Sequence, residues 1–193
     1  MNKRVVFLSL LIICIFILVI ASFKDEKTPE FVLTKMGAKP SNIIHVEYVS
    51  NGAFVFVDRD LSGFSCVFVR KNIFGWKYDY DVAQGDLTPF FTKCGLSFSK
   101  FPKVRSVPFP LYYGVISDSS IQAVEVRYNM ETQVSKATVI ENGSNRLWIA
   151  PVNNIDEGDV IVTGLSIERE EISRVIETPH DLKFELYNNR TAN

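Results

Sequence analysis

Hydrophobic residues follow two different patterns along this chain of 193 residues. Residues 5–23 are almost all apolar, and none of them is charged. After this run, apolar and polar residues alternate with a period of two in many short segments, a pattern typical of half-buried β-strands. The two patterns predict an N-terminal apolar helix followed by a mainly β fold.

The apolar run is long enough to cross a membrane as a helix. At about 1.5 Å of rise per residue, it would extend for roughly 28 Å, close to the hydrocarbon thickness of a bilayer. Lys3 and Arg4 precede the run, whereas the charges just after it cancel. The positive-inside rule therefore predicts a single-pass transmembrane anchor over residues 1–23, with a cytoplasmic N-terminus and the bulk of the chain extracytoplasmic. The alternative is a secretory signal cleaved after Ala21, which would release the chain.

The segment after the anchor predicts a short helix and a meander of antiparallel strands. Thr28 can cap a helix over residues 28–39 that has Pro29 in its first turn. The dipeptide Asn51-Gly52 indicates a tight turn between two strands. Residues 24–99 are therefore expected to form a helix plus β-meander subdomain. Its predicted strands cover residues 43–49, 53–58, 64–70 and 73–82.

The rest of the chain again predicts short strands. Residues 86–110 show no clear period, and three prolines within residues 100–111 discourage regular pairing, which predicts an extended connection there. Residues 168–177 fit either a helix or a hairpin, and their β-branched residues favour the hairpin. Residues 112–187 are expected to form an immunoglobulin-like (Ig-like) β-sandwich, followed by a polar tail over residues 188–193. The predicted strands cover residues 113–116, 121–128, 136–141, 146–151, 159–168 and 182–186.

Charge is distributed unevenly between the two predicted subdomains. Residues 24–117 carry a net charge of +3, and residues 118–193 carry a net charge of −6. The difference favours two subdomains with different surfaces. The basic excess is too small for a nucleic-acid-binding domain, so no nucleic acid is expected as a partner.

Two of the three cysteines lie outside the predicted anchor. Cys66 and Cys94 could form a disulfide in an extracytoplasmic compartment, or they could remain two buried free thiols that behave as small hydrophobic residues. Their spacing in the sequence does not decide between these alternatives, because a disulfide depends on the distance between the two Cα atoms.

An aromatic stripe runs along the fourth predicted strand. Phe74, Trp76, Tyr78 and Tyr80 alternate with other residues, so a strand would place the four rings on one face. An exposed stripe could stack on sugar rings or receive a partner strand, whereas a buried stripe would belong to a hydrophobic core. The alternation with charged residues favours the core.

No arrangement typical of catalysis or metal binding is recognisable. The two histidines, His45 and His180, accompany no nucleophile motif such as Gly-x-Ser-x-Gly. Acidic pairs at spacing i, i+2, such as Asp79 and Asp81, would share one face of a strand, but no calcium-binding loop or zinc spacing surrounds them. The sequence therefore predicts no catalytic residue, no metal site and no cofactor.

Two segments resemble parts of known exported proteins. The runs FVRKNIFGWKYDYD (residues 68–81) and YYGVISDSSIQAVEV (residues 112–126) are similar to segments of small, single-anchor, uncharacterised exported proteins of Gram-positive bacteria. The resemblance implies a location in the cell envelope, and it implies no activity.

The expected function is that of a membrane-anchored extracytoplasmic binding module, not an enzyme, with an envelope protein or polymer as its partner. One alternative is an envelope enzyme that acts on wall glycan or peptide through acidic residues. Such an enzyme needs two carboxyl groups at a defined separation, which a sequence does not show. The other alternative is an accessory or regulatory subunit of a membrane complex.

Overall fold

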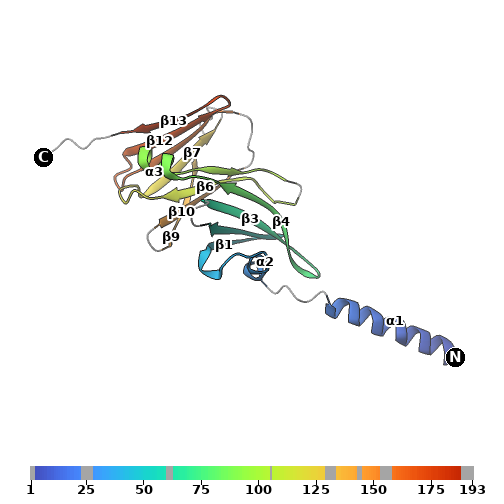
Figure 1. Ribbon diagram of the computed structural model, residues 1–193. Coiled ribbons are helices and arrows are strands. Elements are labelled where there is room, and N and C mark those ends of the chain that lie inside the picture. Colours follow the sequence, from blue (N-terminus) through green and yellow to red (C-terminus); the bar gives the residue numbers. More distant parts are fainter. Residues whose placement is uncertain are drawn as a thin grey trace. The chain divides into compact units, whose positions relative to one another are not determined.

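The computed structural model of the chain is mainly β, with antiparallel sheets (Figure 1), which confirms the predicted class. Two compact units make up the chain: unit 1 consists of residues 1–57 and 66–81, and unit 2 of residues 58–65 and 82–193. Residues 82–99, which the sequence analysis grouped with the meander, thus lie in unit 2. The structure describes residues 3–22, 28–59, 63–104, 106–128, 134–142, 145–152 and 158–187.

Helix α1 (Lys3–Ser22) is the N-terminal element of the chain. Its described side chains are those of residues 8–18, and all of them are exposed. A search of the described residues finds no helix that is both long enough and apolar enough to cross a membrane. The predicted transmembrane anchor is therefore not supported by this search.

Helix α2 (Pro29–Lys35) forms where the sequence predicts a short helix. The Thr28 hydroxyl accepts a hydrogen bond from the backbone N–H of Phe31 at 3.2 Å, so Thr28 caps the helix as expected. The helix ends before the predicted residue 39, because Gly37 adopts a left-handed φ of 94°. A single 3-10 turn, η1 (Pro40–Asn42), follows.

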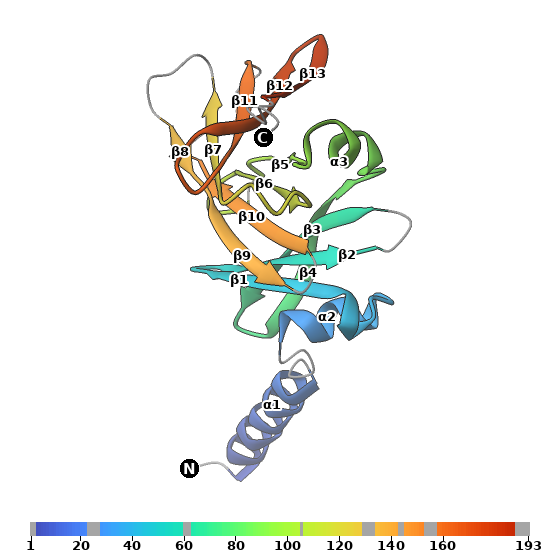
Figure 2. The ribbon, with the colours of Figure 1, turned by 90° about the vertical axis from the view of Figure 1, so that its left-hand side faces the viewer.

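Four strands of the predicted meander form one sheet in the order β1-β2-β3-β4. Val32 and Leu33 of α2 pack with valines of β2 and β3 in the hydrophobic cluster of unit 1. Figure 2 shows α2 next to the strands of this sheet. The bounds are β1 (Ile43–Val49), β2 (Gly52–Asp58), β3 (Phe64–Asn72) and β4 (Gly75–Gln84).

The turn between β3 and β4 lies two residues later than predicted. Asn72 Oδ1 accepts a hydrogen bond from the Phe74 N–H at 2.8 Å, and Gly75 adopts a φ of 121°, which favours glycine. Ile73 and Phe74 therefore lie in the turn, and β4 begins at Gly75.

Unit 2 contains two antiparallel sheets, with strand orders β5-β6-β10-β9 and β13-β12-β11-β7-β8. Strands β11 and β12 form an antiparallel hairpin, which confirms the hairpin alternative for residues 168–177. Strand β5 pairs with β6, so the predicted extended connection partly joins a sheet. The bounds are β5 (Ser99–Phe101), β6 (Leu111–Ile116), β7 (Ala123–Tyr128), β8 (Ser135–Lys136), β9 (Thr138–Asn142), β10 (Asn145–Pro151), β11 (Val160–Leu165), β12 (Glu171–Thr178) and β13 (Asp181–Leu186). The predicted polar tail lies outside the described residues.

The two sheets of unit 2 share one hydrophobic core. Tyr112 of β6 and Trp148 of β10 belong to the same buried cluster as Val126 of β7, Val162 of β11 and Val175 of β12. Two sheets that bury their apolar faces in a common core form a sandwich. The indole N–H of Trp148 donates a hydrogen bond to the Ser97 carbonyl at 2.9 Å, so the one polar group of this buried ring is satisfied.

Helix α3 (Thr88–Cys94) lies in a segment for which no regular element was predicted. Asp86 Oδ1 accepts a hydrogen bond from the Thr88 N–H at 2.9 Å, and hydrogen bonds from the Thr88 side chain and backbone lower the pKa of Asp86. Gly95 ends the helix in a left-handed conformation, with a φ of 64°. The Phe90 ring meets Phe184 of β13 edge to face, with 5.2 Å between centroids, so α3 is attached to the sandwich.

Candidate functional site

The outer face of the five-stranded sheet in unit 2 carries charged side chains from several strands. Val124 and Val126 of β7 belong to the core. Side chains alternate across a strand, so Glu125 and Arg127 of β7 lie on the opposite, outer face. The same reasoning places Ile161 and Thr163 of β11 on the outer face. This surface is called the outer face below.

One row across the outer face alternates in charge. The strand register aligns Glu125 with Lys136 on one side and with Thr163 on the other, and Thr163 with Arg174. Arg174 in turn is aligned with Glu185, and their side-chain charges lie 3.8 Å apart. Opposite charges that face each other across strands stabilise a sheet by about 0.2–1 kcal/mol per pair. This row therefore adds to the stability of the observed register and gives the face both positive and negative charges.

The neighbouring row is apolar in its middle and basic at its ends. Ile161 is aligned with Arg127 on one side and with Ile176 on the other, and Ile176 is aligned with Lys183. The outer face thus offers a half-buried apolar strip bordered by two cations.

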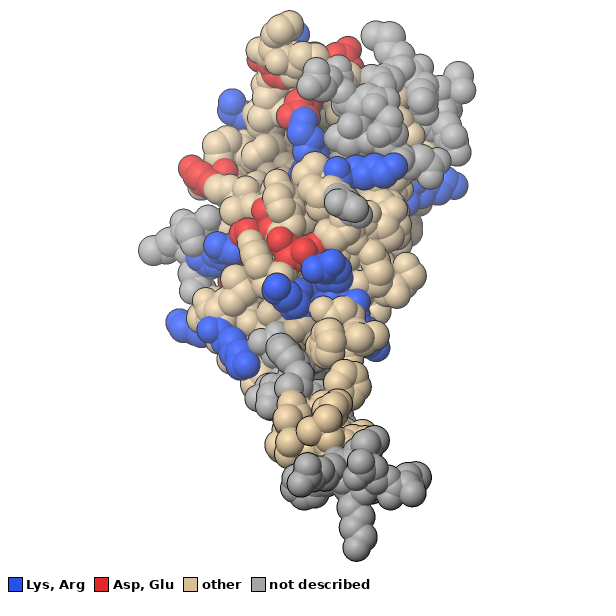
Figure 3. Space-filling model, turned by 90° about the vertical axis from the view of Figure 1, so that its right-hand side faces the viewer, with Lys and Arg blue, Asp and Glu red and all other residues tan. Residues whose placement is uncertain are grey.

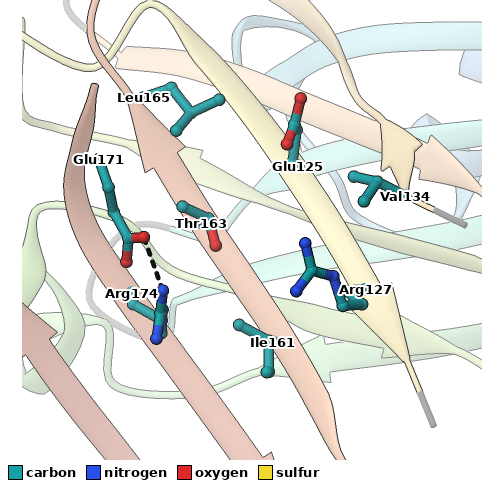
Figure 4. A pocket seen from close by; sticks show the side chains of 8 residues that line it. All are labelled: Glu125, Arg127, Val134, Ile161, Thr163, Leu165, Glu171 and Arg174. Atoms are coloured by element: carbon teal, nitrogen blue, oxygen red, sulfur yellow. Dashed lines mark hydrogen bonds and ion pairs between the residues drawn. The ribbon is translucent and has the colours of Figure 1, made fainter. Parts of the chain in front are cut away.

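A hollow opens between β7, β11 and β12 on this face (Figure 4), with a volume of about 160 Å³. Figure 4 shows side chains from all three strands around it. Ligand pockets for small molecules usually have volumes of about 300–1,000 Å³. The hollow therefore fits one side chain of a partner better than a whole metabolite. Its lining residues are Glu125, Arg127, Val134, Ile161, Thr163, Leu165, Glu171 and Arg174.

Two polar atoms of the hollow are buried without a hydrogen-bond partner among the described residues: Glu171 Oε1 and Arg174 Nε. The two side chains also meet directly, since Arg174 Nη2 donates to Glu171 Oε2 at 2.6 Å. This hydrogen bond is the main cause of the raised pKa of Arg174, so the guanidinium stays charged. A buried polar atom that lacks a partner is a point where water or a ligand can bind.

The other charged side chains in and beside the hollow differ in whether they form hydrogen bonds or ion pairs. Arg169 adopts a left-handed φ of 69° in the turn between β11 and β12 and donates a hydrogen bond to Glu125. Arg127 is exposed, and no ion pair or hydrogen bond of its side chain is found within the described part of the chain. Among the residues that the structure describes, the hollow therefore presents one cation without an ion pair beside two carboxylates that are each held by an arginine.

The hollow offers charged and apolar side chains that can contact a ligand. Its eight lining residues include no His, Cys or Ser, and Thr163 is the only hydroxyl among them. A nucleophile needs an adjacent general base, and both carboxylates here are engaged with arginines. The arrangement suits recognition of a ligand that carries an anionic group next to a small apolar group.

Sequence reasoning missed this site. The alternation Val124-Glu125-Val126-Arg127 showed that charges lie on one face of a strand, but it did not show which strands are neighbours. Glu125 and Arg169 are 44 positions apart in the chain. No sequence pattern indicates such a pair, because it depends on the pairing of β7 with β11.

The aromatic stripe forms only part of the core face that the alternation predicted, since Trp76 and Tyr78 pack against the hydrophobic cluster of unit 1. Phe74 is 46% exposed and Tyr80 is 39% exposed, so the core assignment is wrong for both residues. Trp76 and Tyr78 are half-buried at the border of the unit 1 cluster. The physical reason is that Phe74 lies in the turn before β4, and that of the three rings on the strand only Trp76 and Tyr78 pack against the cluster.

Cys66 and Cys94 are both free thiols in the structure, so the disulfide alternative gains no support. Cys66 is buried in β3, and burial raises the pKa of its thiol well above the ordinary value. Cys94 ends α3, where burial also raises the pKa, and its Sγ lies 3.1 Å from the Leu96 carbonyl oxygen. Thiols with raised pKa values are poor nucleophiles, so neither residue suits catalysis.

The histidines and the acidic pair lie in ordinary polar surroundings. His45 Nε2 lies 3.1 Å from Glu47 Oε2, and His180 lies in the turn between β12 and β13. Asp79 lies 3.8 Å from Arg70, and Asp81 accepts a hydrogen bond from the Tyr78 hydroxyl. Within the described ranges, no group of three or more His, Cys, Asp or Glu side chains is placed to hold a metal ion.

Basic and acidic side chains lie beside one another on the surface shown in Figure 3. A protein that binds nucleic acid through its backbone phosphates clusters Lys and Arg on one face. On the face shown in Figure 3, Lys and Arg are instead mixed with Asp and Glu.

No protein-family model matches the chain, and the searches of curated proteins and of solved structures give no match either.

Proposed function

We propose that this chain is a membrane-tethered extracytoplasmic interaction module that binds a protein partner through the outer face of unit 2. The hollow on that face carries the proposal, since it combines two buried polar atoms and one arginine that lack partners among the described residues with apolar lining side chains. These groups are stabilised when another molecule supplies the hydrogen bonds and ion pairs that they lack. The small volume favours an inserted side chain over a free metabolite.

The tether is proposed for α1. Its large apolar side chains, such as Leu8, Ile12 and Leu18, are 48–66% exposed, and residues 5–23 contain no charge. A contiguous apolar surface of this kind marks a site of contact with a membrane or with another protein. Lys3 and Arg4 before the run favour a cytoplasmic N-terminus. Cleavage after Ala21 is the competing outcome, and it would release the same module from the membrane.

We also infer that the sandwich of unit 2 is Ig-like. Ig sandwiches have strands A, B, E and D in one sheet and C, F and G in the other, with C′ added beside C in some members. With β5 to β12 named A, B, C, C′, D, E, F and G in chain order, the two sheets read A-B-E-D and G-F-C-C′. Strand β13 extends the second sheet beyond G. The outer face therefore belongs to the sheet that contains C, F and G.

Site-specific crosslinking in native membranes tests the binding face. A photo-crosslinking amino acid replaces Thr163 in the hollow of the full-length chain, and in a control it replaces the exposed Thr138 of β9 in the other sheet. We expect a discrete adduct from position 163 that position 138 does not form. Arg127→Glu in the same chain should weaken this adduct. Equal adducts from both positions, or an adduct insensitive to Arg127→Glu, would contradict the proposal.

Protease accessibility tests the tether. Protease added to intact cells should digest unit 2 while the chain stays in the membrane fraction after alkaline carbonate extraction. Digestion only after lysis would place the module on the cytoplasmic side and refute the proposed topology. Recovery of the chain from the culture medium, beginning at Ser22, would favour the cleaved signal.

A further inference from the structure

Two large apolar side chains are exposed at the tip of the β3–β4 hairpin in unit 1. Ile73 is 91% exposed and Phe74 is 46% exposed. Burying such a side chain is worth about 1.5–3 kcal/mol relative to leaving it in water. Turn positions usually hold Gly, Pro, Asn, Asp or Ser, each for a backbone reason that Ile and Phe do not meet. The tip is therefore built for contact with an apolar environment.

The surroundings of the tip match a membrane interface. The Lys71 ammonium lies 5.3 Å from the centroid of the Trp76 ring. The exposed Tyr48 ring meets Trp76 edge to face, with 5.9 Å between centroids. Trp and Tyr concentrate at the headgroup level of bilayers, and lysine reaches from there toward water and phosphate. Apolar residues at the tip with Trp, Tyr and Lys just behind them reproduce that order.

Helix α2, the first element after α1, is linked to this hairpin through side-chain contacts. The Tyr48 hydroxyl donates a long hydrogen bond of 3.4 Å to Glu30 in the first turn of α2. Tyr48 in turn contacts Trp76, two residues from the tip. Helix α1 ends at Ser22 and the cap of α2 is Thr28, so the five residues between them reach at most about 20 Å. A membrane that holds α1 would therefore lie within that reach of Thr28, and α2 is linked to the hairpin through the contacts of Tyr48 with Glu30 and Trp76.

We propose that the tip of the β3–β4 hairpin inserts into the headgroup region of the membrane that α1 enters. Ile73 and Phe74 reach the border of the acyl chains, and Tyr48, Trp76 and Lys71 lie at the level of the headgroups. The inference rests on the proposed tether. Its consequence is that unit 1 is held at two points, by α1 and by the hairpin, which fixes the orientation of unit 1 on the membrane.

Tryptophan fluorescence can test this contact in the full-length chain. The chain has two tryptophans, and Trp148 is fully buried in the core of unit 2. The chain is reconstituted in phosphatidylcholine–phosphatidylglycerol vesicles that contain brominated lipids, which quench nearby indole rings. The difference in quenching between the wild type and Trp76→Phe reports on Trp76. We expect clear quenching of Trp76, reduced at least twofold in the double variant Ile73→Ser, Phe74→Ser.

Ile167→Ser is the matched control, because Ile167 is 73% exposed in unit 2, away from the hairpin in sequence. It should leave the quenching of Trp76 unchanged. Equal urea midpoints for all variants would show that the fold is intact.

Flotation of the vesicles separates the two proposals. A chain that floats with the vesicles while Trp76 stays unquenched overturns the hairpin contact and leaves the tether standing. Quenching that persists in the double variant also overturns the hairpin contact. A chain that does not float at all refutes the tether, and the hairpin proposal falls with it.

Discussion

Gly114 of β6 is a position where one added methyl group should destabilise unit 2. A Cβ at this position would lie 2.0 Å from the Ser97 carbonyl oxygen and 2.7 Å from Trp148 Nε1. Ordinary contacts of a Cβ begin at 3.4 Å, and the closest atom here belongs to the backbone. Alanine at residue 114 therefore forces β6 or the Ser97 segment to move.

The expected cost follows from the contacts at Ser97. Overpacking of a core costs about 1–3 kcal/mol. Movement of Ser97 also weakens two hydrogen bonds of 2.9 Å, one from the Trp148 indole to the Ser97 carbonyl and one from the Val115 N–H to the Ser97 hydroxyl. Each of them contributes about 0.5–1.5 kcal/mol net. We expect Gly114→Ala to lower the free energy of unfolding by about 2–5 kcal/mol.

Urea titration of the full-length chain in detergent measures this difference. The Trp76→Phe background leaves Trp148, which lies beside Gly114, as the only fluorescent indole. Gly85→Ala is the matched control, because a Cβ at residue 85 meets no atom within 4 Å. The control should stay within about 0.5 kcal/mol of the parent. A midpoint for Gly114→Ala equal to that of Gly85→Ala would refute the packing argument.

Three further predictions concern other parts of the chain. Burial raises the pKa of the Cys66 thiol above the ordinary 9.0, so the stability that the neutral thiol contributes is present below that pH and is lost as pH rises through the raised pKa. The urea midpoint of the wild type should therefore fall between about pH 8 and 10, and Cys66→Ala should make that fall less steep. An unchanged slope would contradict this. Thr28→Ala should lower the free energy of unfolding by about 1 kcal/mol, because the cap of α2 is lost. Thr34 does not cap α2, so Thr34→Ala should not have this effect. Thermal melts would show the difference, and equal melting temperatures for the two variants would count against the cap. A double-mutant cycle with Glu171→Gln and Arg174→Gln should give a coupling energy of about 0.5–1 kcal/mol. The value is small because both side chains are partly exposed, and solvent weakens their attraction. Zero coupling would mean that the ion pair adds nothing to stability.

The alternating patterns predicted most strands of both units because they are local. A period of two places every second side chain on one face, and this property survives whatever the strand packs against. The dipeptide Asn51-Gly52 correctly marked the turn between β1 and β2. The capping role of Thr28 was also predictable, since its hydroxyl bonds to a backbone N–H three residues away.

Helix α3 had local signals that the sequence analysis did not use. Pro89 lies in its first turn, Asp86 accepts a hydrogen bond from Thr88, and Gly95 ends the helix. These are the residues that start and stop helices. Helix α2 has the same length and was predicted from such signals, so α3 was missed because the irregular apolar pattern of residues 86–110 was given more weight than its start and stop residues.

The aromatic stripe shows a different kind of limit. Alternation correctly indicates that the rings of a strand share a face, but it carries no information on what covers that face. Trp76 and Tyr78 pack against the hydrophobic cluster of unit 1, whereas Tyr80 on the same strand is 39% exposed. The register of the β3–β4 turn placed Phe74 outside the strand altogether.

The amino-acid sequence by itself determined the apolar N-terminal segment, the mainly β class and the position of most strands. These features follow from the order of residues along a short stretch of chain. Only the tertiary structure decided the strand order of the sandwich and the burial of Cys66 and Cys94 as free thiols. It also decided which charged side chains meet around one hollow, namely Glu125, Arg169, Glu171 and Arg174. The physical reason is that pairing between distant strands sets these contacts, and the energy of that pairing depends on the whole core.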